Sequence, residues 1–222
     1  MPTEAEIPLH RTASHRSSLR KRLVVLCLLW VVALVPFVFF RRNTWFGRPL
    51  SDQQIGEYLH ASQKPRLMLH ALGQIGQRMS RHDPSVSIWY ADLVRLSVDR
   101  NENVRATDAR VMGEAADIPD IHGALLNQLQ DGSQTVRFDA AVSLAGVGDV
   151  AGHDEIIAAL QQSAPTPDQT LQALTALQQI GGERDLAIVA QYEAPRSDIP
   201  ERVRQQAIAT GNAIRSRIRH TK

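Results

Sequence analysis

Histidine and aspartate stand side by side at two places in the sequence, His82-Asp83 and His153-Asp154. A neighbouring imidazole and carboxylate can bind a divalent metal ion, which is the chemistry that such a pair first suggests. The surrounding residues favour a simpler role. Asp83 precedes Pro84 and is predicted to cap a helix, while Asp154 is predicted to lie in a first helical turn, where a carboxylate interacts favourably with the helix dipole. We therefore expect solvent-exposed cap residues at both pairs and no metal site.

The sequence lacks other catalytic motifs. The His-Asp pairs resemble the metal-binding pair of HD phosphohydrolases, but that site also needs an upstream histidine and a downstream aspartate on a deep helical bundle, and neither pair requires such surroundings. No Gly-rich phosphate loop, G-x-S-x-G motif or H-E-x-x-H motif is present. Cys27, the only cysteine, lies in an apolar run. The sequence predicts a protein that is not an enzyme and has no cofactor.

Arginine is the residue type here that is best suited to binding an anionic partner. Six arginines are candidate partner-binding residues, three that follow a valine and three near the C-terminus: Arg105, Arg137, Arg204, Arg215, Arg217 and Arg219. For the first three we favour a structural role, pairing with a nearby aspartate or a helix-end carbonyl. Arg105, for example, has Asp108 three residues later on the same predicted helix surface. For the last three we favour a soluble cap on the final helix over a patch for an anionic partner or lipid headgroups.

The charge of the chain is distributed unevenly. The 222 residues include 25 Lys plus Arg and 23 Asp plus Glu, and 43% of them are apolar. Residues 1–42 hold seven basic and two acidic residues, a charge of +5, so the other 180 residues hold 18 basic and 21 acidic residues, a charge of −3. This composition excludes a disordered acidic or basic tail protein and a disulfide scaffold, and the acidic balance of the larger part gives no reason to expect nucleic-acid binding.

Residues 23–40 form an uncharged apolar run, LVVLCLLWVVALVPFVFF. As a helix these residues would measure about 27 Å, close to the roughly 30 Å thickness of the hydrocarbon core of a bilayer. Basic residues flank both ends of the run, and Trp45 and Phe46 follow where an aromatic belt would lie. The sequence therefore predicts a transmembrane helix over 23–40, through which the protein contacts the membrane.

A cleaved signal peptide is the main alternative to this anchor. No pair of small residues spaced for cleavage follows the run, and Arg41 and Arg42 stand at the point where processing would occur. Five basic residues precede the run and three follow it closely, so we expect a cytoplasmic N-terminus. The predicted organisation is a basic cytoplasmic tail (1–22), a single transmembrane helix (23–40), a linker (41–50) and an extracytoplasmic, periplasmic domain (51–222) at the bacterial inner membrane.

Beyond the anchor, apolar residues recur at helical spacing and no period-two segment appears, which predicts an all-α domain. Helix starts are indicated at Ser51-Asp52, Asp83-Pro84, Pro119, Thr166-Pro167 and Asp198 to Pro200. The predicted helices are about ten to sixteen residues long and are joined by short connections. This pattern is typical of helical hairpins.

The second helices of these hairpins are similar to one another. The aligned segments begin at Lys64, Val104, Val136, Gln169 and Val203, at spacings of 40, 32, 33 and 34 residues. In this register one apolar position is occupied by Leu72, Met112, Leu144, Leu177 and Gly211. A period of this size over five copies indicates a solenoid, because each hairpin leaves an apolar face that only its neighbour can cover.

The Val-Arg pairs, the alanine-rich helices after them and endings such as Ala145-Gly146-Val147-Gly148 make residues 51–218 resemble HEAT repeats, and more narrowly the HEAT-like repeats named for phycobilisome lyases. The resemblance implies a right-handed α-solenoid of about five hairpins that binds proteins or peptides. HEAT-repeat hydroxylases carry repeated His-Glu pairs, which this sequence lacks. We expect a membrane-anchored scaffold that binds a protein or peptide; the alternative is an enzyme or an accessory lyase-type protein with a site on the concave face.

Overall fold

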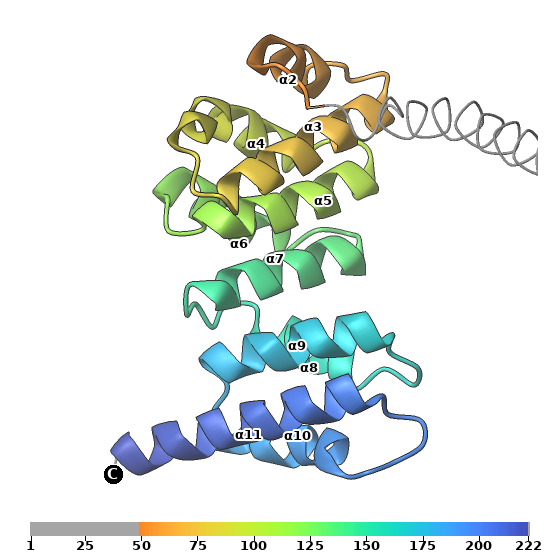
Figure 1. Ribbon diagram of the computed structural model, residues 1–222, viewed down its shortest axis with the longest axis vertical. Helices are drawn as coiled ribbons and strands as arrows, with labels where there is room; N and C mark the ends of the chain where they lie inside the picture. The colour runs from red at the N-terminus through yellow and green to blue at the C-terminus, as the bar shows by residue number, and fades with distance from the viewer. Residues whose placement is uncertain (1–48, 222) are drawn as a thin grey trace, which may run out of the picture. The chain divides into compact units, whose positions relative to one another are not determined.

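The computed structural model describes residues 49–221, and residues 50–221 belong to one compact unit (Figure 1). The predicted all-α fold is confirmed for the described residues, which form ten α-helices and no strand. The helices are α2 (Asp52–Leu59), α3 (Pro65–Met79), α4 (Tyr90–Leu96), α5 (Glu102–Met112), α6 (Pro119–Gln128), α7 (Gln134–Gly146), α8 (His153–Leu160), α9 (Pro167–Ile180), α10 (Leu186–Glu193) and α11 (Glu201–Thr221). Three short 3₁₀ helices accompany them: η1 (Pro84–Trp89), η2 (Gly113–Ala115) and η3 (Glu183–Asp185).

The predicted transmembrane segment 23–40 lies outside the described residues. Within residues 49–221, no helix combines the length and apolarity needed to cross a bilayer.

The helix starts agree with the capping residues in the sequence. The Ser51 hydroxyl accepts a hydrogen bond from the Gln54 backbone N–H at the start of α2, and the Thr166 hydroxyl accepts one from the Gln169 N–H at the start of α9. The Asp83 carboxylate accepts a hydrogen bond from the Ser85 N–H and caps η1. These side chains satisfy N–H groups that have no partner within the helix.

Helix lengths differ from the predicted ten to sixteen residues. Four helices, α2, α4, α8 and α10, have only seven or eight residues, whereas α11 has 21. Part of the expected length before α4 and α10 is instead 3₁₀ helix: η1, which begins at Pro84, and η3, which Gly182 precedes.

The helices pack in chain order, from α2 at one end of the described domain to α10 and α11 at the other (Figure 1). One layer consists of α3, α5, α7, α9 and α11, each packed against the next. The helices that precede them, α2, α4, α6, α8 and α10, pack against these partners. We call the first set the second helices and the other set the first helices.

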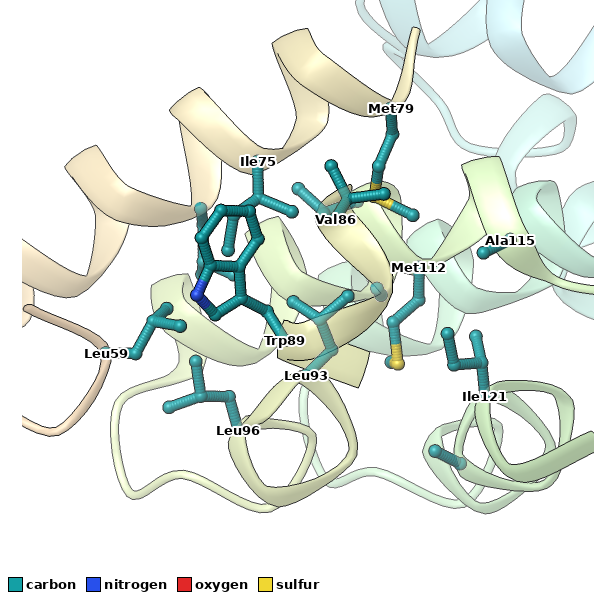
Figure 2. Close-up of a cluster of buried hydrophobic side chains, with 14 of the residues drawn as sticks. Leu59, Ile75, Met79, Val86, Trp89, Leu93, Leu96, Met112, Ala115 and Ile121 are labelled. Carbon is teal, nitrogen blue, oxygen red and sulfur yellow. The ribbon is translucent and has the colours of Figure 1, made fainter. Parts of the chain in front are cut away.

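The first part of the core lies between α2 and α6. Figure 2 shows the side chains of Leu59, Ile75, Trp89, Leu93 and Met112 converging from different helices. All five are at most 3% exposed. Burying an apolar side chain of this size contributes about 1.5–3 kcal/mol, which is the main favourable term that holds these helices together.

Helix α7 joins the two parts of the core. Ala140 and Leu144 pack with the residues from α2 to α6, whereas Phe138, Ala141 and Ala145 pack with the residues from α8 to α11. The apolar interior therefore continues through α7.

The aligned apolar position of the second helices is buried. Leu72, Met112, Leu144 and Leu177 are each fully buried, so the register taken from the sequence is correct for these four helices. Small residues let the second helices approach closely. The hydroxyls of Ser143 and Thr210 donate 2.9 Å hydrogen bonds to the carbonyl oxygens of Ala109 and Leu174, each on the preceding second helix.

Candidate functional site

Arg105 at the start of α5 is held by groups from two loops. Its Nε and Nη2 donate to the two carboxylate oxygens of Asp131 at 2.6 and 2.8 Å, and its Nη1 donates to the Asp99 carbonyl oxygen at 2.7 Å. The hydrogen bonds from Arg105 lower the pKa of the Asp131 carboxyl, and the same contact raises the pKa of Arg105. This guanidinium joins one hairpin to the next.

Arg137 repeats this arrangement at the start of α7. Its Nε donates to Glu155 Oε1 at 2.8 Å, and its Nη1 donates to the Asp131 carbonyl oxygen at 2.9 Å. Arg204, by contrast, pairs with Glu201 within α11. The expected pairing with a nearby aspartate is observed for Arg105, whereas Arg137 pairs with a glutamate and a loop carbonyl and Arg204 pairs with a glutamate of its own helix.

Asp108 does not pair with Arg105, contrary to the expectation from sequence. Its side chain is fully buried, and neither carboxylate oxygen has a hydrogen-bond partner within the described part of the chain. Burial raises the pKa of this carboxyl well above its ordinary value, and the distant charge of Arg95 offsets only part of that effect. Helix α5 turns Asp108 inward because Asp108 occupies the repeat position held by Ala140, Ala173 and Ala207 in other second helices.

Two of the three C-terminal arginines bind groups of the two helices that precede α11. Arg215 Nη2 donates to Glu193 on α10 at 3.1 Å. Arg217 donates to the carbonyl oxygens of Gln178 and Gly181 at the end of α9 at 2.9 and 2.8 Å, where it complements the negative end of the helix dipole. Arg219 is exposed near the end of α11. Arg215 and Arg217 thus link α11 to α10 and α9, and the cap role of these arginines stays a prediction.

His153 is buried, so the expectation of an exposed cap residue is wrong for this position. Its Nε2 lies 3.0 Å from Asp185 Oδ1, and Asp185 also accepts a hydrogen bond from the Gly182 N–H. The neighbouring Asp154 is fully exposed. The sequence cannot show this pair because Asp185 lies 32 residues away. Within residues 49–221, no group of three or more potential metal ligands is present.

One cleft, which we call the α4–α6 cleft, lies between helices α4 and α6. Its volume is about 920 Å³, and residues of α4, α6 and the loops after them line it. Tyr90, Val94 and Ile118 contribute apolar walls, and Gln128 and the Arg105–Asp131 pair also line it. No motif in the sequence indicated this cleft, because helices α4 and α6 meet only through the packing of two hairpins.

A smaller groove, which we call the α7–α9 groove, lies between α7 and α9 in the layer of second helices. Its volume is about 390 Å³, and amide and hydroxyl side chains dominate its lining: Gln134, Thr135, Gln162, Thr166, Gln169 and Gln172. Phe138 and Asp139 on α7 lie beside them. Arg110 Nε stands 3.4 Å from Asp139 Oδ2, yet burial raises the pKa of Asp139 to about 6.

Comparison of the chain with models of known protein families and with curated protein sequences gave no match.

Proposed function

We propose that this protein is a membrane-anchored, non-catalytic scaffold that binds an extended peptide segment of a partner protein in the α7–α9 groove. The observation that carries this proposal is the chemistry of the groove lining. A glutamine side chain both donates and accepts hydrogen bonds, as does a peptide backbone, so Gln169 and Gln172 are matched to main-chain groups rather than to one side-chain type.

Charge at the groove supports the same partner. Arg110 is half exposed and Asp139 is buried beside it, so the groove presents a cation over a carboxylate that holds its proton more tightly than usual. Asp168, which also lines the groove, pairs with Arg202. Since Arg110 lies beside Asp139 and Asp168 is paired, the charges at the groove are largely compensated, and a peptide segment without a strong net charge fits this surface.

The fold proposed for the binding domain is a right-handed α-solenoid of five HEAT-like hairpins, α2–α3, α4–α5, α6–α7, α8–α9 and α10–α11. The apolar position that recurs in the second helices is buried, and Ser143 and Thr210 donate hydrogen bonds to the preceding second helix. Arg105 and Arg137 form ion pairs with residues of the next hairpin, which further supports this fold. A stack of this kind holds its second helices as a continuous surface on which a peptide can lie across several repeats.

The anchor is the apolar run 23–40, with the basic tail in the cytoplasm and the helical domain outside it. A reporter that is active only outside the cytoplasm, fused after Lys222, is expected to be active and to stay with the membrane fraction. Activity in the soluble fraction would establish cleavage. An inactive reporter, with a cytoplasmic reporter active at the same position, would reverse the orientation.

Peptide binding is tested with a random peptide library displayed on phage and selected against the full-length chain in detergent micelles. Replacing Gln169 and Gln172 by alanine is expected to weaken the selected peptides at least tenfold in fluorescence polarisation. Gln179→Ala, on the exposed surface of the same helix, is the matched control and should leave the affinity unchanged. Equal loss in the control, or no enriched peptide at all, would contradict the proposal.

A further inference from the structure

The α4–α6 cleft has apolar walls that the domain itself leaves uncovered. Tyr90, Val94 and Ile118 are only partly buried although they pack on the core, and Val98 at the mouth of the cleft is 79% exposed. Val98 has the largest exposed fraction among the exposed large apolar side chains of the described residues. A partner that covers these side chains removes their apolar surface from water, which favours binding.

The charges that line the cleft are mostly negative. Three aspartates, Asp99, Asp120 and Asp131, face one arginine, Arg105. Because Arg105 already forms a two-pronged ion pair with Asp131, its charge is compensated. The Asp99 carboxylate accepts a hydrogen bond from the Asn101 N–H, but neither Asp99 nor Asp120 forms an ion pair with any described residue. The cleft therefore attracts a cation.

A buried amide supplies a second, independent sign of a ligand. Gln128 lines the cleft and is only 3% exposed. Its Nε2 donates to the carbonyl oxygens of Ser97 and Arg105 at 3.2 and 3.3 Å, which fixes the orientation of the amide. The remaining atom, Oε1, has no hydrogen-bond partner in the described part of the chain. A buried acceptor without a donor is costly, and an N–H group from a ligand would remove that cost.

We propose that the α4–α6 cleft is a second docking site, independent of the α7–α9 groove, for a partner segment that carries a lysine or arginine next to apolar side chains. The apolar side chains of the segment cover Val98, Val94 and Tyr90, and its cation lies against Asp99 and Asp120. An N–H group of the basic side chain or of the segment's backbone donates to Gln128 Oε1. A chain with two such sites holds two different segments at once.

The proposal is tested with the same phage library, selected against the full-length Gln169→Ala, Gln172→Ala variant, whose groove is disabled. The enriched peptides are expected to contain lysine or arginine within a few residues of leucine, isoleucine, valine or an aromatic residue. Their affinity should fall at least tenfold in the Val98→Ser, Asp120→Asn double variant and should weaken as salt is raised. Both positions are exposed, so the variant is expected to fold normally, and circular dichroism and thermal melting verify this.

The matched control is the Val150→Ser, Asp154→Asn variant. Val150 is 60% exposed, and Asp154 is an exposed carboxylate in the first turn of α8, as Asp120 is in the first turn of α6. Binding unchanged in this control and lost in the cleft variant supports the site. Enrichment of uncharged or acidic peptides, equal binding by both double variants, or self-association of the chain through the cleft in place of peptide binding would overturn it. Because the groove is disabled throughout, none of these results depends on the α7–α9 groove.

Discussion

Arg105 and Asp131 lie 26 residues apart in the chain, yet two hydrogen bonds of 2.6 and 2.8 Å join them. Arg105 lies in the first turn of α5, the second helix of one hairpin, and Asp131 lies in the loop that leads to α7, the second helix of the next hairpin. The backbone carbonyl oxygen of Asp131 in turn accepts a hydrogen bond from Arg137. One aspartate thus links the starts of α5 and α7, in addition to the Ser143 hydrogen bond and the core packing between these helices.

Arg105→Lys is expected to lower the free energy of unfolding by about 1–3 kcal/mol, because lysine cannot reproduce the two-pronged contact and also reach the Asp99 carbonyl. Urea unfolding of the full-length chain in detergent micelles measures this. Arg202→Lys is the control, since Arg202 contacts Asp168 through one nitrogen and both side chains are largely exposed. That change should stay within about 0.5 kcal/mol. Equal effects in the two variants would refute a structural role for the partly buried Arg105–Asp131 pair.

The same pair predicts a pH dependence at acid pH. Since the pKa of Asp131 is lowered in the folded state, its contribution to stability is complete above the ordinary aspartate value near 4. The contribution is lost as the pH falls through the lowered folded-state pKa. Asp131→Asn should therefore destabilise the protein at pH 7 and lose less stability than the wild type between pH 5 and pH 2. A constant difference between the two proteins over this range would show that Asp131 is not the titrating group.

Leu144→Ala is expected to lower the free energy of unfolding by about 2–5 kcal/mol, because Leu144 is fully buried at the repeated apolar position of α7. Val150→Ala, a truncation at an exposed position, should have an effect below about 0.5 kcal/mol. Urea unfolding of both variants provides the comparison, and an effect of Leu144→Ala as small as that of the control would mean that this position is not part of the core.

The repeated apolar position and the helix caps could be predicted from the sequence because both are local patterns. Ser51, Asp83 and Thr166 cap helices within three residues of themselves, and Leu144 lies on a face with 3.6-residue periodicity. The same periodicity correctly predicted that four residues at the repeated apolar position are buried: Leu72, Met112, Leu144 and Leu177.

Contacts between hairpins could not be predicted in this way. The partners of Arg105 and His153 are 26 and 32 residues distant, and their identity depends on how hairpins stack. Asp108 shows the opposite case, in which a contact that the sequence predicts is absent from the structure. A charged residue three positions after an arginine favours a surface pair in an isolated helix, but the packing of α5 against its neighbours decides that this side chain is buried. The cleft and the groove likewise form between residues of different hairpins.

Asp108→Asn is expected to stabilise the protein at pH 7. The raised folded-state pKa means that the folded protein keeps a proton that the unfolded chain releases near pH 4, so stability falls as the pH rises from that value toward the folded-state pKa. Asparagine removes this titration while keeping nearly the same volume. Urea unfolding between pH 4 and pH 8 should show a flatter profile for the variant, with Asp154→Asn, at an exposed side chain, as the control. A profile as steep as that of the wild type would exclude Asp108 as its source.

Arg217→Gln and Arg219→Gln separate the cap role of the last helix from a general effect of charge. Arg217 donates to two carbonyl oxygens at the end of α9, so its loss should lower the free energy of unfolding by about 0.5–1.5 kcal/mol. Arg219 is exposed near the end of α11, and its loss should have an effect below about 0.5 kcal/mol. If binding of the full-length chain to anionic lipid vesicles fell equally in both variants while stability stayed unchanged, the arginines would act as a lipid-binding patch instead.

Hydrogen exchange of the full-length chain, with and without a peptide selected on the wild-type protein and bound at saturation, shows where the peptide lies. We expect slower exchange in the first turns of α7 and α9 and in the loop 161–166, where the α7–α9 groove is lined, and this protection should disappear in the Gln169→Ala, Gln172→Ala variant. Protection that lies elsewhere, or that persists in the variant, would contradict a peptide-binding scaffold that uses this groove.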